Sequence, residues 1–216
     1  MELVRVDTQR AYDRLHEMIT TLELPPGASI DEGHLARQLE LGLTPIREAL
    51  KLLIHDNLVE VSPHGGIFVA DVDIPALEQI SELRRLLESF CARQAAQRAT
   101  ADDLAVLEAL RQEQGGIPAD DRERWFDLDH RFHQAIARAA HNKYLAQTLD
   151  HYFGLSQRLW YLALPHLGFL PAAVEIHLDL VEAIKDGDAA RAEDLMSTHV
   201  QDFYAKVQEV LADKET

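Results

Sequence analysis

The sequence has a single cysteine, no long apolar run and few basic residues for its length. Cys91 alone cannot form an intrachain disulfide, which indicates a reducing compartment. No apolar stretch approaches the roughly 20 residues of a transmembrane helix. The first residues, MELVRVDTQR, lack the apolar segment of a signal peptide. We therefore expect a soluble, cytoplasmic protein rather than a secreted or membrane protein.

Acidic residues dominate the charge, with 37 Asp and Glu against 21 Lys and Arg and a net charge of −16. This balance argues against a general polyanion binder. It does not exclude DNA binding through one locally basic face, because DNA binding depends on the electrostatic potential at that face and not on the net charge of the chain. The chain has 216 residues, 47% hydrophobic residues, eight prolines and ten glycines. Together with long segments of 3.6-residue periodicity, this composition predicts a mainly α-helical protein with a proper core.

The character of the sequence changes near VADVDIP, residues 69–75. Short elements with turn signals precede this stretch, and long amphipathic helices follow it. We therefore expect one domain over residues 1–72 and a second over residues 73–216. Asp73 is the predicted cap of the first helix of the second domain, with Pro75 at the helix start.

The first domain shows the order of a winged helix-turn-helix. DTQRAYDRLHEMITTLEL, residues 7–24, predicts a helix, and DEGHLARQLE predicts a short helix opened by Asp31. After the turn LGL, TPIREALKLLIHDN predicts a further helix with Thr44 as its cap and Pro45 as its first residue. LVEVS, PHGG and IFVAD then predict a β-hairpin.

A helix-turn-helix places its second helix in the major groove, with the N-terminal residues near base edges. We expect DNA contacts from that helix, from the helix before it and from the wing tip: Arg37, Thr44, Arg47, Lys51, His64 and Gly65. Arg47 and Lys51 lie one helical turn apart on the same face. Residues 1–73 contain six Lys and Arg and thirteen Asp and Glu, a net charge of −7. We therefore expect modest, salt-sensitive DNA binding that a dimer on two half-sites would strengthen.

These residues also carry a family resemblance. LPPGASIDEGHLARQLELGLTPIREALKLLIHDNLVEVSPHGGIFVA closely resembles the DNA-binding domain of GntR-type transcriptional regulators, over about residues 8–70. The resemblance implies DNA contacts at Arg37, Thr44, Arg47, His64 and Gly65. The family usually has Ser-Arg before the Thr-Pro, whereas this chain has Gly42 and Leu43. An arginine that usually contacts DNA is therefore absent, which leaves the operator sequence open.

The second domain predicts an antiparallel bundle of about six helices. They fall near residues 75–98, 102–114, 120–140, 143–163, 169–186 and 188–212. QGGIP, HNK and KDGD are the clearest breaks between them.

Four potential metal ligands lie on the apolar faces of these helices. In DLDHRFHQAI, Asp129 precedes His133 by four residues, so both project from one face. His177 lies ten residues before Gly187 and His199 twelve after it. In an antiparallel hairpin, at about 1.5 Å per residue, these two imidazoles face each other within about 3 Å of the same height. If the Asp129 helix packs on this hairpin, three histidines and one aspartate converge.

Such a ligand set suits a divalent transition metal. Zinc is the default expectation, and nickel or manganese is possible. An octahedral ion would keep two positions open for water or a carboxylate ligand. Each histidine alone is also explained as a hydrogen-bonded core residue, and the Asp129–His133 pair as a helical ion pair.

LDHRFHQAIARAAHN and EIHLDLVEAIKDGDAARAEDLMSTH resemble the effector-binding FCD domain of the FadR-like branch, over about residues 75–212. The resemblance implies a metal-binding member with the ligands Asp129, His133, His177 and His199. ISELRRLLESF resembles the first helix of this domain, where Arg84 matches a position often near the ligand pocket. Its guanidinium could hold a carboxylate, or it could instead form a surface or interdomain ion pair with an acid such as Glu88.

We therefore expect a homodimeric transcriptional regulator that binds palindromic operator half-sites, and we favour a repressor over an activator. A small organic acid at or near the metal would control its DNA affinity. A metal-sensing regulator, a metal-dependent hydrolase and a purely structural metal remain alternatives. We do not expect an enzyme, because no obvious general base accompanies the ligands. The effector, the operator, the metal and the direction of regulation stay open.

Overall fold

The computed structural model describes residues 2–72, 74–118, 120–163 and 171–212. The chain divides into two compact units. The N-terminal unit runs to Ile74 and includes Gln157–Tyr161, and the helical unit comprises Pro75–Ser156 and the residues from Leu162 onward. The predicted mainly helical fold, a winged helix-turn-helix followed by a helical bundle, is confirmed.

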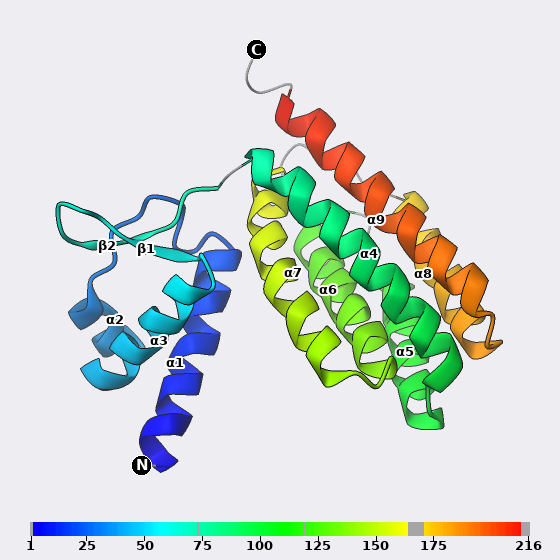
Figure 1. Ribbon diagram of the computed structural model, residues 1–216, viewed down its shortest axis with the longest axis horizontal. Helices are drawn as coiled ribbons and strands as arrows, with labels where there is room; N and C mark the ends of the chain where they lie inside the picture. The colour runs from blue at the N-terminus through cyan, green and yellow to red at the C-terminus, as the bar shows by residue number, and fades with distance from the viewer. Residues whose placement is uncertain (1, 73, 119, 164–170, 213–216) are drawn as a thin grey trace. The chain divides into compact units, whose positions relative to one another are not determined.

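The N-terminal unit is a three-helix assembly with a small wing (Figure 1). Its elements are α1 (Glu2–Thr20), α2 (Glu32–Gln38), α3 (Leu43–His55), β1 (Val59–Val61) and β2 (Ile67–Val69). The strands pair antiparallel, with Val59 opposite Val69. α1 packs against α3 through fully buried side chains that include Leu15, Ile19 and Leu50. This core fixes the outward face of α3.

The start of α3 differs from the prediction. Asp31 caps α2 as expected, because its side chain accepts a hydrogen bond from the His34 amide. Thr44 is not the cap of α3, however. The helix begins at Leu43, with Gly42 at the cap position and no side-chain cap. Pro45 is then the third residue of α3 rather than the first, which the helix tolerates because amides of the first turn have no intrahelical partner. The first helix also ends earlier than predicted, at Thr20.

Two glycines shape the tip of the wing. Gly65 and Gly66 have φ values of +92° and +97°, in the region that favours glycine. A Cβ atom on Gly66 would lie 2.9 Å from the Phe68 ring. The tight turn between β1 and β2 therefore depends on glycine, and it leaves His64 and Gly65 exposed.

Six described helices form the helical unit (Figure 1). They are α4 (Ile74–Arg98), α5 (Ala101–Gln114), α6 (Arg122–Ala139), α7 (Lys143–Ala163), α8 (Pro171–Lys185) and α9 (Ala189–Ala212). Their ends lie within two residues of the predicted positions. The predicted cap Asp73 lies outside the described residues. Gly187, with a φ of +72°, joins α8 and α9 into the expected hairpin.

The core of the helical unit is apolar and continuous, and α6 contributes several of its side chains. Its largest fully buried side chains include Leu107, Leu128, Phe132, Ile136 and Leu180. Among the described helices, none combines the length and the apolar character that a membrane span requires.

Candidate metal centre and candidate DNA-binding face

The four predicted metal ligands meet inside the helical unit. α6 supplies Asp129 and His133 one turn apart, α8 supplies His177 and α9 supplies His199. The Nε2 atoms of His177 and His199 lie 3.3 Å apart, and those of His133 and His199 lie 3.1 Å apart. The hairpin therefore brings its two imidazoles together, with ring planes tilted by 58°, and α6 packs on that hairpin.

The aspartate completes a compact group of donor atoms. Oδ1 of Asp129 lies 3.3 Å from Nε2 of His177 and 3.7 Å from Nε2 of both His133 and His199. One donor atom from each of the four residues lies within 4.8 Å of the others. Ligands at about 2.1 Å from one ion are separated from each other by roughly 3 to 4 Å. The five separations given above, 3.1 to 3.7 Å, match this requirement.

The electrostatics of the cluster favour a bound cation. Burial lowers the pKa of His177 to about 4. Burial also opposes a charge on His133, but the Glu88 and Asp129 carboxylates outweigh it and raise the pKa of His133 to about 9. The same attraction from His133 overcomes burial and holds the pKa of Asp129 well below its usual range. A metal ion would take the place of the His133 proton beside these carboxylates, so its binding would release protons.

A second carboxylate, Glu88 on α4, contacts the ring nitrogen of His133 that does not belong to the donor group. Its Oε2 contacts Nδ1 of His133, and its Oε1 accepts a hydrogen bond of 2.6 Å from Nε of Arg84. Burial alone would raise the pKa of Glu88, but Arg84 and His133 outweigh it and lower this pKa to about 2. An ionised Glu88 beside Nδ1 of His133 would favour a proton on that nitrogen, so that Nε2 is the nitrogen that would give up its proton to bind a metal.

The sequence did not predict the contact between Glu88 and His133. It indicated Glu88 only as a possible partner of Arg84 in a surface or interdomain ion pair. That pair is present, but it lies within α4 and is buried, with both side chains about 5% exposed or less. Arg84 also donates a 3.0 Å hydrogen bond from Nη1 to Ser156 on α7. The only indication in the sequence was that Glu88 lies one helical turn after Arg84, on the same inward face of α4.

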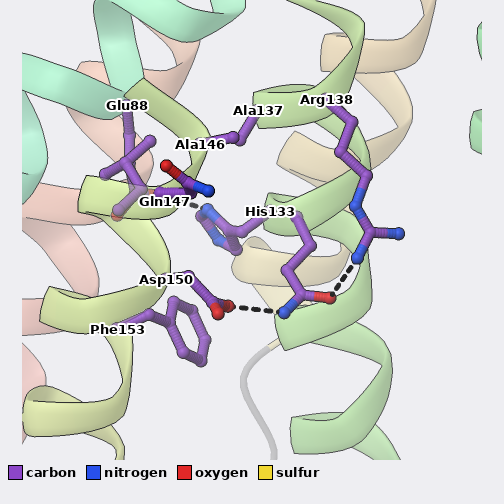
Figure 2. A pocket seen from close by; sticks show the side chains of 10 residues that line it. Glu88, His133, Ala137, Arg138, Ala146, Gln147, Asp150 and Phe153 are labelled. Carbon is purple, nitrogen blue, oxygen red and sulfur yellow. Dashed lines mark hydrogen bonds and ion pairs between the residues drawn. The ribbon is translucent and has the colours of Figure 1, made fainter. Parts of the chain in front are cut away.

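A small cavity of about 180 Å³ lies beside His133. Figure 2 shows that Phe153 and Asp150 of α7 and His133 and Arg138 of α6 contribute to its walls. The Arg84 guanidinium lies over the Phe153 ring, 4.7 Å from its centroid. Pockets for drug-sized ligands measure roughly 300 to 1,000 Å³, so this cavity suits a molecule of only a few heavy atoms.

The six predicted DNA contacts are all exposed on the N-terminal unit: Arg37, Thr44, Arg47, Lys51, His64 and Gly65. The two basic residues of α3 are engaged with acids of the same unit. Nε of Arg47 lies 2.7 Å from Glu32, and Nζ of Lys51 lies 2.7 Å from Glu48. Exposed ion pairs contribute only about 0 to 1 kcal/mol, so DNA phosphates can displace them at low cost.

Comparisons with known proteins place this fold in a family. The model of the gntR family of bacterial regulatory proteins matches residues 7–69, and that of the FCD domain matches residues 79–202. An uncharacterized HTH-type transcriptional regulator in an unstable DNA locus of Streptomyces ambofaciens is 32% identical, over 96% of this chain and 88% of its own length. The protein belongs to the GntR family and has an FCD domain.

Other GntR-type relatives are also regulators. The HTH-type transcriptional repressor RspR of Escherichia coli is 25% identical, over 94% of this chain and 89% of its own. The galactonate operon transcriptional repressor of the same species is 27% identical, over 94% and 97%. The solved structure of Escherichia coli McbR/YncC superposes with a TM-score of 0.81 at 24% identity, covering 94% of this chain and 97% of that one. These comparisons identify a transcriptional regulator rather than an enzyme.

Proposed function

We propose that this GntR-family protein is a transcriptional repressor whose operator affinity is controlled by a small organic acid bound at or near a divalent metal ion. Residues 1–72 would bind DNA, and residues 73–216 would hold the metal, the effector and the dimer contacts. The observation that carries the proposal is the convergence of four donor atoms within 4.8 Å inside the FCD domain. Repressors among the relatives support the direction of regulation.

Asp129, His133, His177 and His199 are the proposed ligands. Three imidazoles and one carboxylate suit zinc best, with nickel or manganese as alternatives. The ion would supply Lewis-acid positions to which an effector carboxylate can bind. Glu88 would keep His133 in the tautomer that a metal ligand needs, and Phe132 would support His177, whose ring it stacks on with centroids 4.2 Å apart.

Arg84 is the proposed effector contact. It is buried, and its guanidinium lies over Phe153, a wall of the 180 Å³ cavity. A carboxylate that enters there would compete with Glu88 for Arg84. Because Glu88 also contacts His133, this exchange would link effector binding to the metal ligands and to the packing of α4 against α6 and α7.

The exposed side chains of α3 and the wing are the proposed DNA interface. A homodimer would place two copies of this face on the half-sites of a palindromic operator and so strengthen binding by an acidic chain. We propose a cytoplasmic protein, because its operator DNA lies in that compartment in bacteria.

Metal analysis of the purified full-length protein tests the ligand set. We expect stoichiometric metal in the wild type and almost none in His177→Ala. His130→Ala is the matched control, because His130 is a half-buried α6 histidine that stacks on Phe153 outside the donor group. Unchanged metal content in His177→Ala would overturn the proposed site.

DNA-binding titrations test the regulation. An operator would be selected in vitro, and its affinity measured with small mono- and dicarboxylic acids, with and without metal. The proposal requires a carboxylate that changes DNA affinity in the metal-loaded wild type but not in Asp129→Ala. A response to free metal alone would instead favour a metal sensor. A chelator that lowers the melting temperature and leaves DNA affinity unchanged would show a structural ion.

A further inference from the structure

The outward face of α3 begins with an exposed leucine. Leu43 is the first residue of α3 and is 45% exposed. The buried side of α3 is formed by Ile46, Leu50 and Leu53 with their neighbours, each of these three no more than 1% exposed. Leu43 lies at the edge of that buried side, three residues before Ile46 and seven before Leu50, yet much of its side chain stays exposed. Its exposed part is therefore available to a partner of the N-terminal unit.

Leu43 shares a stripe of α3 with the two basic residues, because Leu43, Arg47 and Lys51 follow one another at intervals of four. Arg47 is paired with Glu32 and Lys51 with Glu48, which reduces the positive potential along the stripe. The first residue of the stripe, Leu43, is thus apolar, and the positive charges of Arg47 and Lys51 are partly neutralised by their acidic partners. Because DNA phosphates can displace these exposed pairs, Arg47 and Lys51 would contact the backbone, and the leading position would be left for an apolar contact.

The N-terminal residues of a recognition helix approach base edges in the major groove. A leucine side chain has no hydrogen-bonding group, so it cannot distinguish bases by their donors and acceptors. The apolar group that the major groove offers is the C5-methyl of thymine. Gly42, which precedes Leu43, has no side chain to obstruct this approach and has ordinary extended dihedral angles.

We propose that Leu43 is a specificity-determining residue that selects thymine at one base pair of each half-site by packing on the C5-methyl group. The proposal rests on the DNA-binding function proposed above and adds a residue-level preference to it. A protein partner covering Leu43 is the competing explanation, and it predicts no dependence on thymine methyl groups.

The experiment begins with in vitro selection of an operator by the full-length wild-type protein from a random duplex library. Each thymine of the selected operator is then replaced singly by deoxyuridine, which removes the methyl group and keeps the base-pairing groups. We expect one position per half-site at which the replacement weakens wild-type binding about fourfold, the ratio expected for burying one methyl-sized group. Leu43→Ala should bind the thymine and uracil operators equally.

Leu52→Ala is the matched control, because Leu52 is 47% exposed near the other end of α3. It should keep the wild-type preference for thymine. Wild-type protein that is indifferent to every uracil replacement would overturn the inference, whatever the variants do. Leu43→Ala that keeps the full preference would also overturn it. Failure to enrich any DNA sequence would overturn the proposed DNA-binding function itself, and the inference with it.

Discussion

The two units use ionic groups in opposite ways. In the N-terminal unit, the Arg47 and Glu32 side chains are 56% and 25% exposed. In the helical unit, the Arg84 and Glu88 side chains are 5% and 4% exposed. An exposed pair exchanges its partner for water or phosphate at little cost, whereas a buried pair that loses one partner is destabilised by several kcal/mol. The first arrangement suits reversible contact with DNA, and the second keeps its geometry unless an incoming carboxylate gives Arg84 a replacement partner.

The largest expected effect comes from removing the carboxylate of the buried cluster. Asp129→Asn takes away the negative charge that attracts the ion and keeps the side-chain shape. We expect the metal affinity to fall by more than the roughly 10- to 100-fold typical of a supporting residue, as measured by competition with a chelator of known affinity. Asp127→Asn, an exposed change on the same helix, is the control. Equal metal affinity in Asp129→Asn and the control would remove Asp129 from the ligand set.

A smaller effect is expected behind the cluster. Glu88→Gln removes the charge that orients His133, so the metal affinity should fall about 10- to 100-fold. The affinity must be measured at a temperature where the variant is folded, because the buried Arg84 also loses its partner. Glu108→Gln, which breaks an exposed pair with Arg111 on α5, is the matched control. A lower melting temperature with unchanged metal affinity would mean that Glu88 only stabilises the fold.

The smallest effect is expected at the surface. Glu32→Gln frees Arg47 for DNA phosphates, so the operator affinity should rise about two- to fivefold, within the range of one exposed ion pair. The gain should shrink as salt rises. Glu17→Gln removes the same charge from an exposed pair on α1 and is the control. A rise of equal size in both variants would show a general charge effect instead of a local competition.

The sequence predicted contacts within one helix or hairpin better than contacts between helices that are distant in the chain. Asp129 and His133 lie on one helix, and His177 and His199 lie on one hairpin, so local periodicity and residue counting placed each pair. The approach of Glu88 to His133 joins α4 to α6, and it depends on how each helix is rotated in the bundle. Periodicity carries no information about that rotation.

Sequence patterns also did not fix the first residue of α3, and they did not decide between two roles for Arg84 and Glu88. Thr44 followed by Pro45 is a good helix start, but the same residues fit equally well two positions further inside α3. Arg84 and Glu88 at four-residue spacing were compatible with an ion pair and with a ligand-binding arginine. Only tertiary packing distinguishes such alternatives, and the functional roles of these residues remain predictions.

The α8–α9 hairpin makes the number of residues between His177 and His199 part of the site. Each residue added within a helix turns everything beyond it by about 100°. One insertion between Gly187 and His199 that α9 absorbs would carry the His199 imidazole off the face that meets α6. We therefore expect related chains that keep this site to vary freely in exposed side chains here, while gaining or losing residues elsewhere. For this pair of ligands, the spacing is inherited together with the side chains.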